Sequence, residues 1–435
     1  MLDQSLVFRY YIYMLQSQLF TKTRKEAPSD EVSKNAQLLI RAGFVHKEMA
    51  GVYTYLPLGL RVLKNIEKII KEEMDAIGGQ ELQLTALQDK AIWEKTDRWS
   101  DDILDVWFKT KLQGGTEVGL ATTHEEPLTR LMQNYISSYK DLPFGAYQIQ
   151  TKFRNELRAK SGIMRGREFL MKDLYSFCKD EKEQEEYYEK VAQSYEKIFN
   201  RIGLGDITYK TFASGGSFSK YSHEFQTLTE AGEDTIYIDE KKKIAVNKEV
   251  LNDEVLVDIG LKKDSLVEKK SVEVGNIFTL GTRFSEPLGL MYKDSQGKEN
   301  SVVMGSYGIG LGRVMGVVAE VLSDDAGLVW SAETAPFQVH IVTIGDHQDV
   351  LKQAQDLKES LENEGLSVLW DDRDTGPGEK FADSDLIGIP LRVVLSAKTM
   401  ESGTIEIKKR TEEKPSHITE NEAFNGRVKE LLGEM

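Results

Sequence analysis

The stretches that decide the fold are KFRNE at residues 152–156 and RGREFLMKD at residues 165–173. Each is typical of a β-strand, and the basic residues between them predict a loop. The first stretch contains Arg154 and Glu156, while the second adds Arg165 and Phe169. Cations, a carboxylate and an aromatic face in so short a span predict a site that holds a nucleoside triphosphate and an acyl group.

The segments around these strands predict an antiparallel sheet flanked by helices. Residues 31–42 carry apolar side chains at helical spacing, and residues 60–77 predict a longer amphipathic helix with Lys and Glu opposite its apolar stripe. Residues 81–84 alternate like a strand, and residues 180–200 predict an acidic helix that buries a face rich in tyrosine. The fold class expected from this pattern is α+β.

The pattern of predicted strands and helices changes near residue 334. Over residues 334–435 strands and helices alternate, which predicts a separate α/β domain. Residues 14–333 are expected to form the first domain, with residues 240–272 as a short charged insertion on its surface. Residues 1–13 are expected to be an N-terminal extension, with Met14 as an alternative start.

The composition is that of an ordinary globular chain. Of the 435 residues 40% are hydrophobic and 29% charged, and the net charge is −15. No apolar run approaches the roughly 20 residues that a membrane span needs. The single cysteine, Cys178, excludes an internal disulfide and a cysteine-based metal cluster, so we expect a cytoplasmic protein without zinc. The negative charge argues against general affinity for nucleic acid, but it leaves room for a local basic surface.

A glycine-rich motif, SYGIGLGR, follows at residues 306–313 and leads into an apolar helix at residues 314–322. Glycines such as Gly310 let the backbone turn and pack closely against a ligand, and Arg313 is placed to hold the far end of a triphosphate. The run is not a Walker motif, because no Gly-Lys-Ser/Thr follows. It is not a dinucleotide fingerprint either, because no βαβ unit precedes it.

The sequence TTHEE at residues 122–126 leaves two interpretations open. Thr123 and Glu125, two residues apart on one strand face, can accept both N–H groups of a secondary ammonium. Alternatively, Thr123 and Glu126 form a capping box where a helix begins. His124 has no evident partner, and a structural role is expected for it.

Activation of a carboxylate by ATP requires cations between two anions and fixed positive partners for the departing pyrophosphate. The planar fork of Arg154 suits both the α-phosphate and the substrate carboxylate. Glu156 is expected to accept from the adenine amino group, and Phe169 to stack on the base. Arg165 joins them as a further contact to ATP.

In order and wording these motifs resemble motifs 2 and 3 of the class II aminoacyl-tRNA synthetases, and in detail the bacterial prolyl family. The resemblance covers nearly the whole chain from Met14. It implies a class II catalytic domain, a C-terminal anticodon-binding domain, and Glu273 as the carboxylate that holds Mg²⁺ on ATP. In that family a Thr-x-Glu loop grips the imino group of proline, and Thr123 and Glu125 match it.

The resemblance implies further contacts to substrate. Beside Arg154, the pocket for proline is expected to include Met171, Asp173, Phe225, Phe278 and Ser306. The residues expected to touch tRNA are Arg158 and Lys160 at the acceptor end, and Arg373 and Lys380 in the anticodon-binding domain.

The chain also departs from that family. The large editing domain is missing, and only residues 240–272 stand in its place, so editing of mischarged alanyl-tRNA in cis is not expected. Thr85 stands where motif 1 usually has the proline of a dimer interface, although a homodimer is still expected. Ser306 replaces a common cysteine, and residues 158–160 read Arg-Ala-Lys instead of Arg-Pro-Arg. A zinc-binding C-terminal extension is not expected.

The expected function is ATP-dependent activation of L-proline and its transfer to tRNA(Pro), without membrane attachment. The alternative is a non-catalytic synthetase-like protein that binds tRNA or an amino acid. Such paralogues typically lose motif arginines, whereas Arg154 and Arg313 are both present. A threonyl enzyme would need a zinc site, which one cysteine makes improbable.

Overall fold

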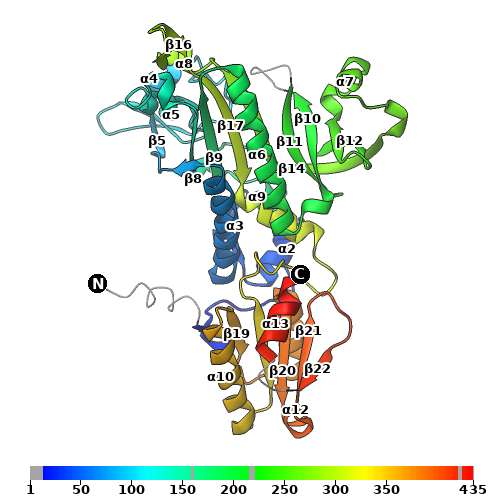
Figure 1. Ribbon diagram of the computed structural model, residues 1–435. Coiled ribbons are helices and arrows are strands. Elements are labelled where there is room, and N and C mark those ends of the chain that lie inside the picture. The colour runs from blue at the N-terminus through cyan, green and yellow to red at the C-terminus, as the bar shows by residue number, and fades with distance from the viewer. Residues whose placement is uncertain (1–12, 158–160, 215–220, 420–423, 435) are drawn as a thin grey trace. The chain divides into compact units, whose positions relative to one another are not determined.

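The computed structural model describes residues 13–157, 161–214, 221–419 and 424–434 (Figure 1). The described residues divide into two compact units. One unit comprises those within Met1–Lys47, Thr54–Ile66 and Val318–Met435, and the other comprises Glu48–Tyr53 and Glu67–Val317. The proposed boundary near residue 334 therefore differs from the division by contacts, because the beginning of the chain packs with its end.

The second unit is built on a large, mainly antiparallel sheet. The strands on either side of the basic loop are β8 (Phe144–Phe153) and β9 (Glu168–Cys178), which pair along their length. Because β8 ends at Phe153, Arg154 and Glu156 lie just beyond the strand on which they were predicted. Beside β9 lies β17 (Val303–Gly310), and beside β17 lies β14 (Val267–Gly281). The strand predicted at residues 81–84 lies earlier in the chain, since β4 (Gly79–Glu81), which runs parallel to β8, ends at Glu81.

The segment predicted as a surface insertion is partly woven into this sheet. Within it β13 (Ile244–Asn247) pairs with β12 (Asp234–Asp239) and with β10 (Thr208–Ser214), and β10 in turn pairs with β11 (Tyr221–Leu228). Only the helix α7 (Asp253–Asp258) and its flanking loops project from the sheet. The prediction failed because short alternating strands among lysines and acids look like exposed loops.

Helix α6 (Glu181–Ile202) covers one face of this sheet (Figure 1). It begins with the side chain of Asp180 capping Glu183 and ends at Gly203, whose φ of 95° only glycine adopts readily. Its buried residues include Tyr195 and Phe199, which pack over Gly275 of β14. The helix predicted at residues 180–200 is thus confirmed, and the opposite face of the sheet is left for the site.

The C-terminal residues form the expected α/β fold. The sheet has the strand order β1-β19-β18-β20-β21-β22. Its predicted strands are β18 (Val339–Ile344), β19 (Val368–Asp371), β20 (Leu391–Ser396) and β21 (Thr404–Lys409). The sheet also contains β22 (Ser416–Thr419), and the short helix α12 (Ala397–Ser402) follows β20; neither was predicted from the sequence.

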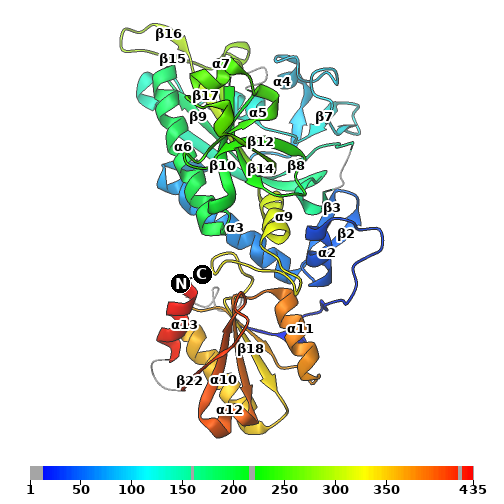
Figure 2. The same cartoon turned by 90° about the vertical axis from the view of Figure 1, so that its right-hand side faces the viewer.

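Helices enclose this second sheet on both faces (Figure 2). Helices α10 (Gln348–Asn363) and α13 (Phe424–Gly433) share one apolar core with the sheet, and α11 (Pro377–Ile387) lies on the other side. An unexpected edge strand, β1 (Tyr13–Leu15), pairs in parallel with β19. Of the extension predicted at residues 1–13, all but Tyr13 lies outside the described residues.

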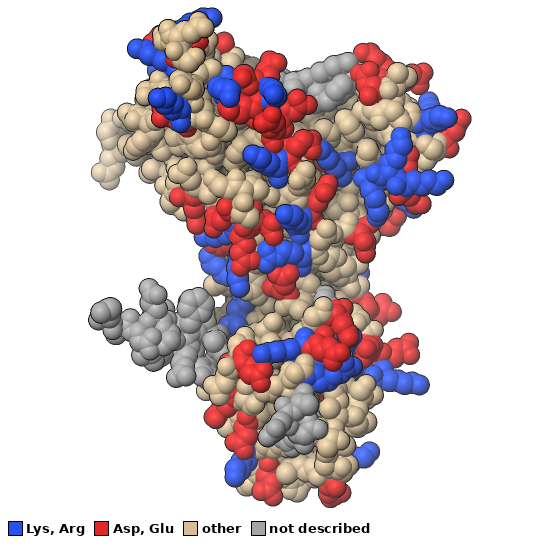
Figure 3. Space-filling model, in the orientation of Figure 1, with Lys and Arg blue, Asp and Glu red and all other residues tan. Residues whose placement is uncertain are grey.

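The first two α-helices of the described chain follow their predictions closely. The helix predicted at residues 31–42 is α2 (Lys34–Arg41), and the one predicted at residues 60–77 is α3 (Pro57–Ala76). Among the described helices, none is long and apolar enough to cross a membrane. Acidic and basic side chains intermingle over the face shown in Figure 3.

Candidate active site

A cavity of about 310 Å³ opens on the face of the large sheet opposite α6. Successive residues of a strand point to opposite faces. Met171, Asp173 and Tyr175 of β9 therefore line the cavity, whereas Lys172 and Ser176 hydrogen-bond to residues of α6. The strand β9 thus supplies both a wall of the cavity and an anchor to the helix behind it.

The structure brings most of the predicted site residues together. Those expected to contact proline that line this cavity are Thr123, Glu125, Arg154, Met171, Asp173, Phe278 and Ser306. Those expected to contact ATP line an adjoining hollow, and they are Arg154, Glu156, Arg165, Phe169, Glu273, Gly310 and Arg313. Because Arg154 and Glu156 border both spaces, the two predicted sites are continuous. The role of each residue stays a prediction.

Arg313 is fixed at the start of α9 (Leu311–Val321). Its Nε donates to the Met164 carbonyl at 3.0 Å, and its Nη1 donates to the carbonyl and the carboxylate of Glu273 at 3.0 and 3.1 Å. The amide of Asn276 donates to the other oxygen of that carboxylate at 2.8 Å. The glycine-rich motif is the end of strand β17 running directly into α9, not the turn that was predicted.

Arg154 is held far more loosely than Arg313. Its Nε and Nη2 approach the Thr122 carbonyl at 3.4 Å, which is long for a hydrogen bond, and its guanidinium lies 5.4 Å from the centre of the Phe169 ring. Burial, and then the neighbouring Arg313, lower the pKa of Arg154. A half-buried cation with such weak partners is set up to receive an anion.

Glu156 and Arg165 form the rim of the hollow. Nε and Nη2 of Arg165 both donate to one carboxylate oxygen of Glu156, at 3.0 and 2.8 Å. The remaining Arg165 nitrogen donates to Glu233 at 2.5 Å. The arginine therefore orients Glu156 through one oxygen only, and no hydrogen bond described for Glu156 uses the other oxygen.

The Thr123–Glu125 pair lies at the far end of the cavity. The Thr123 hydroxyl donates to the Glu125 carboxylate at 2.7–2.8 Å, and the Tyr175 hydroxyl lies 3.4 Å from it. Thr123 lies between β7 (Glu117–Leu120) and α5 (Glu125–Met132), and Glu125 is the first residue of α5, so neither is on a strand as predicted. The capping box is also wrong, because His124 is the N-cap residue and its side chain makes no cap bond.

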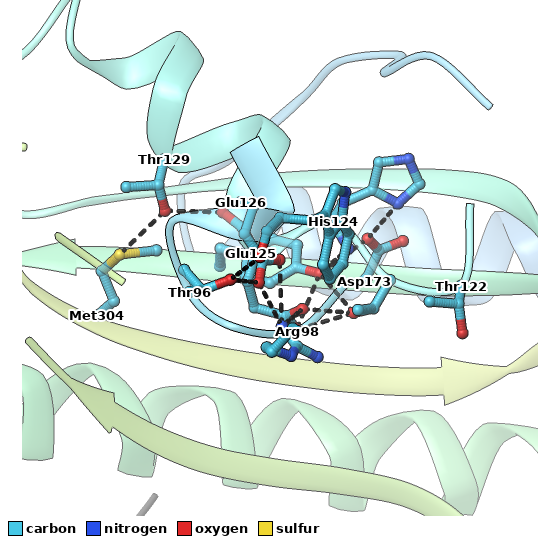
Figure 4. A network of polar contacts seen from close by, with 12 residues as sticks. Thr96, Arg98, Thr122, His124, Glu125, Glu126, Thr129, Asp173 and Met304 are labelled. Carbon is cyan, nitrogen blue, oxygen red and sulfur yellow. Dashed lines mark hydrogen bonds and ion pairs between the residues drawn. The ribbon is translucent and has the colours of Figure 1, made fainter. Parts of the chain in front are cut away.

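Arg98 binds the two glutamates that begin α5 (Figure 4). Its Nη1 lies 3.2 Å from Glu125 and 2.9 Å from Glu126. Thr96 donates to Glu126 at 2.7 Å. Against the effect of burial, Arg98 lowers the pKa of Glu125, whereas burial raises the pKa of Glu126 to about 7.

Asp173 anchors a second buried charge network. Lys152 forms an ion pair with it at 2.7 Å, and Gln148 donates to it at 3.0 Å. Lys152 also lies 2.6 Å from Nδ1 of His124, whose Nε2 lies 3.1 Å from the Thr85 carbonyl. Burial, and then Lys152, lower the pKa of His124 to about 4, so this ring is neutral at pH 7. His124 thus has structural contacts, in line with its expected role.

Three carboxylates, those of Glu224, Asp234 and Glu273, lie near one another. Gln226 donates to Glu224 at 2.8 Å and to Asp234 at 2.9 Å. Burial, and then the nearby charge of Glu273, raise the pKa of Glu224 to about 7. Within the described residues, no group of three or more potential ligands forms a ready-made metal cluster.

Comparison with known proteins places this geometry in a family. Residues 108–322 match the family model described as the tRNA synthetase class II core domain (G, H, P, S and T), and residues 338–430 match the anticodon binding domain. A proline–tRNA ligase from Anaplasma phagocytophilum is 38% identical over 416 residues, which cover 91% of this chain and 96% of that protein. The chain belongs to the proline–tRNA ligase family. The bacterial-type class II synthetase fold predicted from the motifs is thereby confirmed.

Other members of the family match over similar lengths. The proline–tRNA ligase of Zymomonas mobilis is 36% identical and covers 95% of this chain and 98% of its own. A crystal structure of prolyl-tRNA synthetase from Cryptosporidium parvum, complexed with halofuginone and AMPPNP, has a TM-score of 0.76. It covers 92% of this chain and 77% of that chain at 18% identity, a likeness in fold.

Two predicted contacts of the proline–tRNA ligase site need correction. Phe225 of β11 lies opposite Gly275 in the sheet and packs against Tyr195 and Phe199 of α6, so it faces away from the cavity. Lys380 is 3% exposed, and its ammonium donates to two backbone carbonyls of the C-terminal domain. A lysine used in this way stabilises the domain and does not present its charge to a base.

The other predicted contacts to tRNA are not tested by the geometry. Arg373 remains at the surface of the C-terminal domain but pairs with Asp371 at 2.7 Å and with Asp383 at 2.9 Å. Arg158 and Lys160 lie outside the described residues.

Sequence reasoning missed Arg98 and Glu224. Arg98 belongs to a loop whose spacing matches no motif, and the wider sequence gives no sign that it reaches α5. Glu224 lies in SHEF, one residue from the phenylalanine that was chosen instead. The alternation of a strand would have favoured Glu224 had the facing of β11 been known.

Proposed function

We propose that this protein activates L-proline with ATP and transfers the prolyl group to tRNA(Pro). The observation that carries the proposal is one continuous cavity with an amine acceptor at one end and a loosely held arginine at the other. Thr123 and Glu125 form the amine acceptor, and Arg154 is the loosely held arginine. Met171 and Phe278 supply apolar walls, which suit a ring without polar side-chain atoms.

The residues around the cavity suit the chemistry of adenylate formation. A secondary ammonium donates to Thr123 and Glu125, which orients the amino acid. The substrate carboxylate and the α-phosphate then share Arg154, which brings two anions within reach. The carboxylate oxygen attacks the α-phosphorus, and the bond to the pyrophosphate oxygen breaks.

The nucleotide is proposed to lie in the adjoining hollow. The free oxygen of Glu156 accepts from the adenine amino group, and the base stacks on Phe169. Arg313 is already fixed by three hydrogen bonds, so it offers a cation to the outer phosphates without losing further side-chain freedom.

The carboxylates near Arg313 fit Mg²⁺ bound with ATP. The charge of Glu273 raises the pKa of Glu224, and a divalent cation with oxygen ligands relieves that repulsion. When bound, Mg²⁺ neutralises charge on the phosphates. Glu273, with Glu224 beside it, is the residue proposed to hold it.

We assign tRNA binding to both parts of the chain. The basic residues of the loop after β8 are proposed to meet the acceptor end, and Arg373 is proposed to meet the anticodon. Without a large editing domain, hydrolysis of alanyl-tRNA(Pro) in cis is not expected. The protein is further proposed to act in the cytoplasm as a homodimer, which light scattering after gel filtration would test.

The deciding experiment is ATP–pyrophosphate exchange with each of the twenty amino acids. Proline is expected to support the fastest exchange, and transcribed tRNA(Pro) is expected to become charged. A folded protein that exchanges pyrophosphate equally with or without proline would overturn the proposal. Charging with alanine in the same assay should give a product that persists, whereas rapid deacylation would contradict the absence of editing.

A further inference from the structure

Two consecutive glutamates share a single arginine beside the cavity (Figure 4). Glu126 is 0% exposed and Glu125 is 7% exposed, so neither has ready access to water. The same Nη1 atom of Arg98 lies within hydrogen-bond distance of both carboxylates, at 3.2 Å from Glu125 and 2.9 and 3.1 Å from the two oxygens of Glu126. Two buried like charges would otherwise keep a proton between them.

Other charged groups lie around this pair, and Arg154, which is proposed to bind the substrate carboxylate, lines the same cavity. Lys152 cancels the charge of Asp173, and the buried His124 is neutral at pH 7. Arg283 is half-buried and is affected by the charges of Arg98 and both glutamates, but it does not line the cavity. The neighbouring hydroxyls of Thr96, Thr123 and Tyr175 carry no charge. The hydrogen-bonded group of Arg98, Glu125 and Glu126 by itself carries one negative charge.

We propose that Arg98 and Glu126 are positioning residues that determine specificity for a cationic amine. Arg98 cancels the charge of Glu126 and keeps the Glu125 carboxylate ionised and directed at the substrate. The single net charge matches one secondary ammonium, so a neutral or doubly charged group is disfavoured. This inference rests on the proposed function, because it names what the amine acceptor depends on.

Arg98 also has structural contacts, which the test must separate from this role. Its guanidinium lies 5.0 Å from the Trp93 ring and 5.2 Å from the Phe284 ring, and its carbonyl accepts from Trp107. A loss of activity on replacing Arg98 alone is therefore ambiguous. The charge argument makes a distinct prediction, because removing both partners restores the balance.

The test compares Arg98→Gln, Glu126→Gln and the double variant. The KM for proline and the kcat of pyrophosphate exchange are measured from pH 6 to pH 9. Each single variant is expected to raise KM about tenfold with little change in kcat, since each disturbs one charge-assisted contact. For Arg98→Gln the KM should fall as pH rises, because the glutamate pair then loses its retained proton. The double variant is expected to return to within about threefold of the wild type, without that pH dependence.

Two further variants keep the test sharp. Arg98→Lys preserves the charge and is expected to stay within about fivefold of the wild-type KM. Arg130→Gln changes an arginine of α5, the helix that carries Glu125 and Glu126. The side chain of Arg130 is 52% exposed, and the variant is expected to behave as wild type. Unfolding of every variant is followed by circular dichroism.

Several outcomes would overturn the inference. If the increases in KM of the two single variants simply combine in the double variant, Arg98 acts through packing alone. The same conclusion would follow if Arg98→Lys raised KM as much as Arg98→Gln does. A wild-type KM in Arg98→Gln would remove the residue from substrate recognition. If the wild-type protein itself shows no proline-dependent exchange, the proposed function fails instead, so the two failures are distinguishable.

Discussion

Replacing Arg154 with alanine is expected to abolish activation while leaving the fold almost unchanged. The residue touches the protein through two hydrogen bonds of 3.4 Å to one carbonyl and a ring 5.4 Å away. Ordinary hydrogen bonds contribute about 0.5–1.5 kcal/mol, and bonds this long contribute less. The cation–π contact adds about 0.5–1 kcal/mol. Burial of the cation and repulsion by Arg313 oppose both, so the free energy of unfolding should change by about 1 kcal/mol or less.

The effect on the reaction is expected to be far larger. Removing one donor that stabilises developing charge costs about 10²–10³ in kcat. Arg154 is proposed to bridge the carboxylate and the α-phosphate, so the loss should reach at least about 10³. A small change in stability together with a large change in rate is expected for a residue that binds an anionic substrate and contributes little to folding.

The assay combines proline-dependent pyrophosphate exchange with urea unfolding. In the wild type, proline with a non-hydrolysable ATP analogue at about 100 times its dissociation constant should add about 2.7 kcal/mol to the free energy of unfolding. Arg154→Ala should lose most of this gain, whereas the exposed Arg130→Ala should keep it. Exchange within tenfold of the wild type, or unfolding easier by about 3 kcal/mol, would refute the reasoning.

Three further expectations concern the body of the protein. In Gly59→Ala the new Cβ would overlap the Phe44 carbonyl oxygen, so unfolding in urea should become easier by about 3 kcal/mol, whereas Gly378→Ala, with open space around it, should be neutral. Burial lowers the pKa of His340 from 6.5 to about 4, so the unfolded chain binds this proton first and stability falls as pH drops from 6.5 to 4. The complete loss is about 3 kcal/mol of the free energy of unfolding, and it should be missing from full-length His340→Gln. The measurement is the free energy of unfolding at each pH, and equal pH profiles for the variant and the wild type would contradict the expectation. Burial raises the pKa of the Cys178 thiol to about 12, so a thiol reagent at pH 8 should label the chain only after unfolding, and rapid labelling of the native protein would disprove the burial.

Periodicity predicted the long helices correctly, since α3 and α6 lie where helical spacing placed them. The strands β8 and β9 exist as predicted, but their bounds differ, because β8 ends at Phe153 and β9 begins at Glu168. Short strands were harder, because three or four residues give too few alternations to separate a strand from a loop. The strand β13 was hidden in this way within the supposed insertion.

Neither the face of the sheet to which each side chain of β11 points nor the pairing of β1 could be predicted from the sequence. Phe225 has the chemistry of a pocket wall, but its position in the sheet turns it toward α6, and its neighbour Glu224 lies opposite Asn276 on the other face. The edge strand β1 adds to a sheet made of residues more than 300 positions later, and no local pattern encodes that partner.

The sequence by itself determined the chemistry of the site. Arg154, Glu156, Glu273 and Arg313 were identifiable because catalysis with ATP demands those residue types and because the motifs keep them in order. Tertiary structure alone decided how the charges are balanced. A loop arginine, Arg98, meets two glutamates of α5, and a buried lysine meets Asp173. Charge balance depends on distance in space and on exclusion of water, and neither is written in the spacing of residues along the chain.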